Sequence, residues 1–282
     1  MERSLVADRL QAAVNAARTA GQNLLEKPLG TVERHDKGQS DVVTEMDAAT
    51  ERFLKSYLHQ LFPTDDFLGE EEGREVHGGT GMWVIDPIDG TNNYTHDIPN
   101  YTISIGFEES PGKPILGVVY CPRQDELFHA AEGAGAYLNG KAISVSIVAD
   151  PLQALTIISP PFRYPRYRAD YFHVLSKLGS TTGDFRDFGS AALHLCYIAC
   201  GRADAFFEYG LKYHDIAAAM VIVAEAGGAI APIDEGRQVP LTGDIIVSNA
   251  LLHDWYVHHI RAWLEENRNV PDKSEKTDTV LL

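Results

Sequence analysis

The chain has 282 residues, with 40 acidic residues against 24 Lys and Arg, and its formal charge is −16. Its 44% hydrophobic content excludes general disorder, and its acidic balance argues against a nucleic-acid partner or an anionic membrane surface. The longest uncharged run covers 188–201, which is too short to cross a bilayer, and three separated cysteines suit a reducing compartment. Because the N-terminus carries charges where a signal peptide needs an apolar stretch, we expect no export and a cytoplasmic location.

The N-terminal half is predicted to begin with helices and to continue with strands. Apolar residues recur at helical spacing over 3–26, and a second helix is expected over about 47–61. The stretch 27–43 begins with Pro and Gly and ends polar, which indicates a strand followed by a mobile loop. Apolar runs bounded by Gly, Pro or Asp predict successive strands over 82–86, 101–108, 114–120 and 126–131. Asn139-Gly140 between apolar residues is typical of a tight hairpin turn.

The second half alternates between strand and helix patterns. Strands are expected over 154–159, 203–208 and 245–248, and helices over 168–178, 189–200, 215–226 and 251–265. We place a boundary near Asp150-Pro151 between an N-terminal α+β subdomain (1–150) and a C-terminal α/β subdomain (151–265), with a disordered polar tail over 266–282. Because helices and strands mix without strict βαβ order, we predict an α+β fold built of layers.

The densest signal for a functional site is the segment Trp83-Val-Ile-Asp86-Pro-Ile-Asp89-Gly90-Thr91. An apolar strand runs into two carboxylates that a proline holds in one shape, and Thr91 is placed to open a short helix. At about 4 Å the two charges repel by about 4 kcal/mol for an effective dielectric near 20, so one carboxyl is protonated or a cation lies between them. Such oxygens suit Mg²⁺, and the N–H groups of Gly90 and Thr91 would face an anion. An Asp-rich turn with helix caps explains the same residues equally well.

Acidic residues also cluster upstream. Glu70 is the first of three acids after an apolar strand end, which makes it a candidate ligand, whereas Glu71 and Glu72 are typical of a solvated loop. Thr44-x-x-Asp47 fits a capping box for the second helix, and from these residues alone this structural interpretation is the stronger one.

A further acid lies in the second half of the chain. Asp215 precedes an Ala-rich run that ends at Gly227-Gly228, where we expect the helix to end. Asp215 fits the N-cap of that helix, and it is also well placed to complete a metal site against a closely packed sheet.

These segments together resemble the inositol monophosphatase family of Mg²⁺-dependent sugar-phosphate phosphatases. WVIDPIDGTNNY is similar to that family's first signature, and HDIAAAMVIVAEAGG to its second. The order of the segments (DVVTEMD, GEE, DPIDGT, then HD…EAGG) is also the family's, from the first helix to about residue 265.

The resemblance implies a layered αβαβα sandwich and assigns roles to individual residues. Two or three Mg²⁺ ions would be held by five groups, namely Glu70, Asp86, the Ile88 carbonyl, Asp89 and Asp215. Thr91 and Asp47, with Glu70, would form the catalytic set, in which Thr91 and Asp47 polarise a water on the metal shared by Glu70 and Asp86. Without divalent cations, a phosphate dianion could not enter a pocket of carboxylates.

Substrate contacts follow from the same resemblance. They comprise Asp89, Gly90, Thr91, Gly189, Ser190, Ala191 and Glu208. Lys37, on the loop before Asp41, is either a residue that steers phosphate or an ordinary surface lysine. Tyr213-His214 stands where the family commonly has Trp, and Ala219 stands where Gly is frequent, so the leaving-group side of the pocket departs from the pattern.

The resulting hypothesis is hydrolysis of myo-inositol monophosphate, or of a related small polyol or sugar phosphate, by metal-activated water. Three alternatives share the fold: fructose-1,6-bisphosphatase, histidinol-phosphate phosphatase and 3′-phosphoadenosine 5′-phosphate phosphatase. A different alternative is a regulatory protein that keeps the fold and acts by binding other proteins. The resemblance also implies lithium sensitivity and a homodimer.

Overall fold

Two β-sheets form the frame of the protein in the computed structural model, which describes residues 3–27, 34–38, 41–79 and 81–268. The first is an eight-stranded sheet with the order β10-β9-β8-β7-β6-β5-β3-β4. Its strands are β3 (Asp66–Gly69), β4 (Arg74–Glu75), β5 (Met82–Asp89), β6 (Thr102–Ser110), β7 (Lys113–Cys121), β8 (Glu126–Ala131), β9 (Ala136–Leu138) and β10 (Lys141–Ile143). Most neighbours are antiparallel, but β3 and β5 run parallel.

The second sheet has five strands in the order β12-β11-β13-β15-β14. Its strands are β11 (Leu155–Ile158), β12 (Asp184–Arg186), β13 (Ala205–Glu208), β14 (Gly228–Pro232) and β15 (Ile245–Asn249). A separate hairpin pairs β1 (Arg34–Gly38) with β2 (Asp41–Thr44). The helices are α1 (Arg3–Glu26), α2 (Glu45–Leu61), α3 (Thr91–Thr95), α4 (Arg168–Leu178), α5 (Ala191–Ala199), α6 (Tyr213–Glu225), α7 (Val239–Thr242) and α8 (His253–Arg268).

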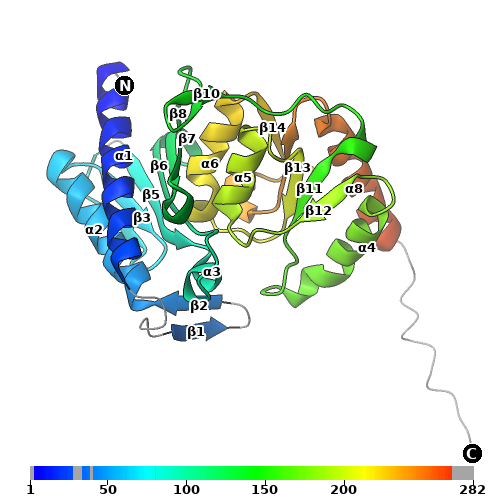
Figure 1. The fold of residues 1–282 in the computed structure, drawn as a ribbon, viewed down its shortest axis with the longest axis horizontal. Helices are drawn as coiled ribbons and strands as arrows, with labels where there is room; N and C mark the ends of the chain where they lie inside the picture. Colours follow the sequence, from blue (N-terminus) through cyan, green and yellow to red (C-terminus); the bar gives the residue numbers. More distant parts are fainter. Residues whose placement is uncertain (1–2, 28–33, 39–40, 80, 269–282) are drawn as a thin grey trace, which may run out of the picture.

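The helices and sheets stack in five layers (Figure 1). Helices α1 and α2 cover one face of the eight-stranded sheet, and α5 and α6 lie between the two sheets, where α6 packs on β6 and β7. Helices α4 and α8 cover the outer face of the five-stranded sheet. The predicted αβαβα sandwich is therefore confirmed.

The central layer is thin because its facing residues are small. A Cβ atom at Gly117 would lie 2.0 Å from the Ala218 carbonyl oxygen, and one at Gly106 would lie 3.1 Å from the Ala218 nitrogen. The Ala-rich face of α6 thus contacts the backbone of the sheet directly, and this contact brings the start of α6 close to the end of β5.

Local signals in the sequence explain several element ends. Thr44 caps α2, with the Met46 N–H donating to Thr44 Oγ1, and Asp47 accepts from the Thr44 N–H at 2.8 Å, so the predicted capping box is present. Asn139 and Gly140 both have positive φ, as the hairpin between β9 and β10 requires.

Some element boundaries differ from the expectation. Residues 41–44 form strand β2 where a mobile loop was expected, and the rest of that expected loop lies partly outside the described residues. Helix α6 begins at Tyr213 and not at Asp215, because Lys212 occupies the N-cap position. Helix α8 runs on to Arg268, and the remainder of the expected tail lies outside the described residues. Strand β14 lies at the edge of the second sheet, where it pairs with β15. It was not predicted, since its sequence GAIAP begins with Gly and ends with Pro.

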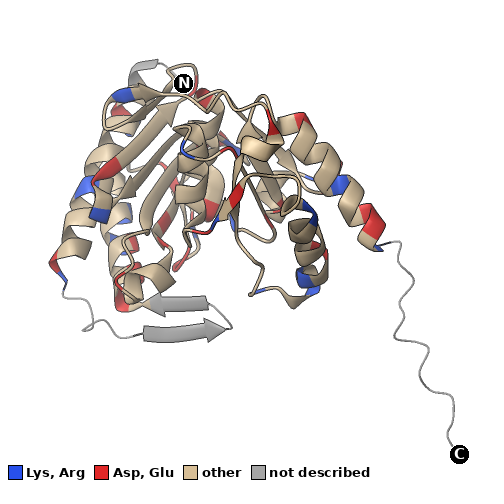
Figure 2. Cartoon of the chain, turned by 45° about the vertical axis from the view of Figure 1, so that its right-hand side comes forward, with Lys and Arg blue, Asp and Glu red and all other residues tan. Residues whose placement is uncertain are grey.

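Charge and hydropathy add two observations. In the view of Figure 2 acidic and basic residues are interspersed over the helices and loops, without a continuous basic face. No helix in the part of the chain that the structure describes is long and apolar enough to cross a membrane.

Candidate active site

Strand pairing brings the predicted acidic ligands together. Gly69 at the end of β3 is paired with Ile85 of β5, so Glu70 follows directly beside Asp86. Asp89 ends the same strand, and Asp215 enters from the first turn of α6. The end of β3, the end of β5 and the first turn of α6 are separate in sequence, and they bring these carboxylates close together.

Burial and mutual repulsion dominate the electrostatics of the three aspartates in this cluster. Asp86 is 1% exposed, and its burial together with the charges of Glu70 and Asp89 holds its pKa well above the ordinary value. Burial and the charge of Asp215 raise the pKa of Asp89 to about 6, and burial raises the pKa of Asp215 to about 6. A cation beside these carboxyls would favour their ionised forms and so oppose the raised pKa values.

One oxygen of each of the three aspartates is anchored by hydrogen bonds from the protein. Asp86 Oδ1 accepts the Ile88 N–H at 3.0 Å, and Asp215 Oδ2 accepts the Lys212 N–H at 2.6 Å. Asp89 Oδ2 accepts Ser190 Oγ–H at 2.6 Å and the Ala192 N–H at 2.7 Å. These bonds fix the carboxyl planes, as a preorganised ligand set requires.

Thr91 and Asp47 form a second, linked pair. Thr91 Oγ1 lies 3.0 Å from Asp47 Oδ1 and 3.0 Å from the Ile88 carbonyl oxygen. Burial raises the pKa of Asp47 to about 6, although hydrogen bonds from Thr44 and Thr91 oppose the shift. The capping box and the site interpretation of Asp47 both apply, since one carboxylate oxygen caps the helix and the other faces Thr91.

Two glycines permit the close approach of the segments that flank the cluster. Gly90 has a φ of 90°, and a Cβ atom there would lie 2.9 Å from the Gly189 carbonyl oxygen. Gly189 also has a positive φ, and a Cβ atom there would lie 2.7 Å from Asn93 Nδ2. Asn93 Nδ2 donates to the carbonyls of Asn100 and Phe188 at 2.6 Å each, which ties the β5–α3 turn to the segment before α5.

The donor set fits Mg²⁺. Four carboxylates and one backbone carbonyl are hard oxygen ligands, and the Asp86 and Asp215 carboxyls lie within hydrogen-bonding reach of each other. Two such groups share a site at neutral pH only through a proton or a cation. In the described part of the chain, no group of three or more Asp, Glu, His or Cys side chains is placed so that it could hold a metal ion as it stands.

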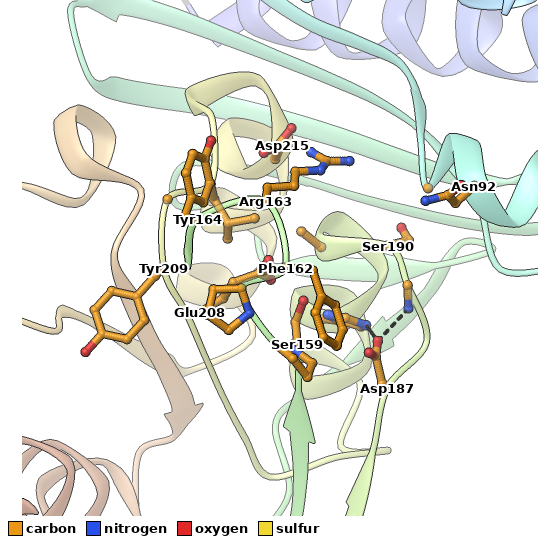
Figure 3. Close-up of a pocket in the computed structure, with 18 of the residues that line it drawn as sticks. Asn92, Ser159, Phe162, Arg163, Tyr164, Asp187, Ser190, Glu208, Tyr209 and Asp215 are labelled. Carbon is orange, nitrogen blue, oxygen red and sulfur yellow. Dashed lines mark hydrogen bonds and ion pairs between the residues drawn. The ribbon is translucent and has the colours of Figure 1, made fainter. Parts of the chain in front are cut away.

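A cavity of about 230 Å³ opens beside the acids (Figure 3). Of the predicted substrate contacts it is lined by Gly90, Thr91, Gly189, Ser190, Ala191 and Glu208, together with Asp215. Burial holds the pKa of Glu208 well above its ordinary value, and Asp215 and Asp187 add to the shift, while a hydrogen bond from Ser159 opposes it. The cavity therefore contains groups that could hydrogen-bond to a polyhydroxylated ligand, and Asp215 of the acidic cluster lines it.

The cavity also contains residues that the sequence did not identify. Arg163 and Tyr164 reach over it from the segment between β11 and α4, and Asp187 and His194 line the side of α5. Burial lowers the pKa of His194 to about 3, so its ring is neutral and its Nε2 accepts the Phe188 N–H at 3.1 Å. The proline-rich run over 159–166 after a strand was the one signal that could have marked this rim.

Two predicted residues fall outside the site description. Lys37 and Asp41 belong to β1 and β2, and the side chains of these two residues lie outside the described part of the structure. His214, which replaces the family's common Trp, is partly buried, and desolvation lowers its pKa to about 4. Its Nε2 lies 3.4 Å from Asp215 Oδ1, so the departure places a neutral imidazole directly against a predicted ligand.

The chain is similar to known proteins both in its sequence and in its fold. Residues 6–265 match the inositol monophosphatase family. The Nus factor SuhB of Escherichia coli is 39% identical over 245 residues, covering 85% of this chain and 91% of that protein. A fructose-1,6-bisphosphatase/inositol-1-monophosphatase of Aquifex aeolicus is 35% identical, covering 88% of this chain and 94% of that protein. The solved structure of the Thermotoga maritima IMPase superposes with a TM-score of 0.82 at 33% identity, covering 92% of this chain and 99% of that one. The chain belongs to the inositol monophosphatase family.

Proposed function

We propose that the protein is a Mg²⁺-dependent phosphomonoesterase that hydrolyses myo-inositol monophosphate or a related small polyol or sugar phosphate. The observation that carries the proposal is the cluster of Glu70, Asp86, Asp89 and Asp215, of which Asp86 is buried and Asp215 lines the cavity. Their combined charge of about −4 matches two divalent cations, which would supply positive charge for the phosphoryl oxygens and acidify a bound water.

The residues of the chain then have distinct tasks in this proposal. Thr91 would accept a proton from the attacking water while passing its own proton to Asp47 Oδ1, 3.0 Å away. Asp47 suits this role because a pKa of about 6 lets it hold the proton only briefly at neutral pH. The N–H groups at the start of α3 would face the phosphate, and Glu208 would accept hydroxyl groups of the substrate.

The relatives support this activity class without fixing the substrate. The Aquifex protein carries both fructose bisphosphatase and inositol monophosphatase in its name, and the Thermotoga structure is described as an IMPase. Fructose 1,6-bisphosphate, histidinol phosphate and phosphoadenosine phosphate therefore stay as alternative substrates. Lithium inhibition, a homodimer and a cytoplasmic location belong to the same proposal.

A substrate panel tests the proposal. Purified protein is assayed for phosphate release from inositol 1-phosphate and the three alternatives, with EDTA or with excess Mg²⁺. We expect Mg²⁺-dependent release from inositol 1-phosphate and its loss in Asp89→Asn and Asp215→Asn. Absence of release from all four compounds would contradict the proposal.

A second candidate function is a regulatory role through binding other proteins. The name Nus factor, carried by the E. coli relative at 39% identity, favours it. If the role exists here, this chain should replace SuhB in an E. coli strain that lacks it, and Asp89→Asn should replace it equally well. Failure of both proteins to restore the strain would count against the second role. The predicted lack of a nucleic-acid partner stays a prediction.

A further inference from the structure

Helix α2 carries three charged residues at four-residue intervals, Asp47, Glu51 and Lys55, and all of them are buried. Their exposed fractions are 1%, 0% and 6%. Spacing of four residues places them along one face of the helix, and charged groups are rarely buried without partners. Asp47 contacts Thr91, but the proposed reaction gives Glu51 and Lys55 no role, so their burial needs another explanation.

Both oxygens of Glu51 are used by the backbone that follows Glu70. Glu51 Oε2 accepts the Glu71 N–H at 2.8 Å, and Glu51 Oε1 accepts the Glu72 N–H at 3.0 Å. A Cβ atom at Gly69 would lie 2.0 Å from Glu51 Oε1. The absence of a side chain at Gly69 therefore leaves room for the Glu51 carboxylate. Residues 69–72 therefore fold around the Glu51 carboxylate. Glu70 lies between Gly69, which packs against this carboxylate, and Glu71, whose N–H donates to it.

Lys55 compensates the buried charge. Its Nζ lies 2.9 Å from Glu51 Oε1, 2.7 Å from Glu75 Oε1 and 3.3 Å from Glu72 Oε2. Burial disfavours the ammonium form, but hydrogen bonds to Glu75 and Glu51 outweigh it and raise the pKa of Lys55. The lysine thus stays charged and joins the far end of the β3–β4 turn to α2.

We propose that Glu51 is a positioning residue, which anchors the turn after β3 so that Glu70 is preorganised to bind the divalent cation. This inference rests on the metal-binding role given to Glu70 in the proposed function. Groups that orient metal ligands typically change metal affinity by about 10–100-fold when they are replaced. Glu51 acts through the N–H groups of Glu71 and Glu72 and does not itself face the metal.

The direct test is Mg²⁺ binding by isothermal titration calorimetry to the whole protein, without substrate. Glu51→Gln keeps the shape of the side chain, but its NH₂ group opposes one of the two backbone N–H donors. We expect the Mg²⁺ dissociation constant to rise by about tenfold or more, in the range for such orienting groups. Hydrogen exchange of the metal-free protein should show faster exchange over residues 70–73.

Glu75→Gln is the matched control. It removes the negative charge of one partner of Lys55 at the same turn but leaves the Glu51 contacts of residues 69–72 intact, so Mg²⁺ affinity should stay within about twofold. Gly69→Ala is the second variant, because its added Cβ atom would displace the Glu51 carboxylate without replacing Glu51. If Glu51→Gln does not fold, Gly69→Ala tests the positioning role. It should weaken Mg²⁺ binding and accelerate exchange in the same way.

Two results would overturn the positioning role: wild-type affinity in both Glu51→Gln and Gly69→Ala, or an equal loss in Glu75→Gln. Phosphate release measured in parallel separates this inference from the proposed function. If the wild type binds Mg²⁺ but hydrolyses nothing, and Glu51→Gln still binds more weakly, the enzyme proposal fails and the positioning role stands. Absence of Mg²⁺ binding by the wild type overturns both.

Discussion

The stability of the metal-free protein should fall as the pH rises through the range in which the buried acids ionise. Asp89 and Asp215 have ordinary pKa values of 3.8, and in the fold the pKa of each is raised to about 6. A carboxyl with a raised pKa binds more protons in the folded than in the unfolded state. Its contribution is therefore complete below about pH 4 and is lost as the pH rises through about 6.

The magnitude follows from the size of the shift. About 2 pKa units correspond to about 3 kcal/mol for one carboxyl, and the two groups interact, so their effects do not add. In a chain of this size, about 3 kcal/mol corresponds to a change of roughly 6–10 °C in Tm.

Differential scanning calorimetry between pH 4.5 and 7.5, with EDTA or with Mg²⁺, measures this effect, and Asp89→Asn isolates it. The asparagine oxygen would still accept from Ser190 and Ala192, but it carries no charge. Without metal the variant should unfold at a higher temperature than the wild type at pH 7.5 and at a similar temperature at pH 4.5. Mg²⁺ should stabilise the wild type mainly above pH 6. A metal-free Asp89→Asn protein that is less stable than the wild type at pH 7.5 would refute the reasoning.

Three further substitutions test separate parts of the structure. Thr91→Ala should lower kcat about 10²-fold or more, while the Mg²⁺ affinity measured by calorimetry changes little. Thr91→Ser should restore most of the activity. A Thr91→Ala enzyme with normal kcat would exclude proton transfer through Thr91 to Asp47. Glu208→Gln should raise the KM for inositol 1-phosphate about tenfold with a smaller change in kcat, since an amide NH₂ group replaces one of the two carboxyl oxygens that could accept substrate hydroxyls. An unchanged KM would remove Glu208 from the substrate site. Gly117→Ala should destabilise the fold by about 1–3 kcal/mol in urea unfolding, because its Cβ atom would lie 2.0 Å from the Ala218 carbonyl oxygen. Gly179→Ala, whose nearest contact would be 3.5 Å away, is the control, and equal losses in the two variants would contradict the packing argument.

The acidic cluster could be predicted from the sequence because its members lie in short segments with strong local constraints. Asp86 and Asp89 are separated by a proline at the end of an apolar strand, and the resemblance to a family added Glu70 and Asp215. The hydrophobic periods also gave the long helices and the central strands, since those elements bury one face against a neighbouring layer. What the sequence could not give was the parallel pairing of β3 with β5, which brings Glu70 beside Asp86.

Residues that act through tertiary contacts were missed. Glu51 and Lys55 read as ordinary polar positions of an amphipathic helix, because nothing in the local pattern shows that residues 69–72 fold over them. Arg163 and His194 reach the cavity through a loop and a helix whose relation to Glu208 depends on the order of the second sheet. Asp215 was expected as an N-cap, but the helix begins earlier, since Lys212 takes the cap position and Asp215 accepts its N–H.

The central claim is that the buried acids bind a divalent cation that enables phosphate-ester hydrolysis. The most direct measurement is the initial rate of phosphate release from inositol 1-phosphate as a function of Mg²⁺ concentration, for the wild type and for Asp215→Asn. We expect saturable dependence on Mg²⁺ in the wild type, no release with EDTA, and a loss of at least about 10²-fold in the variant. Release that persists in EDTA, or an Asp215→Asn protein with wild-type Mg²⁺ dependence, would contradict it.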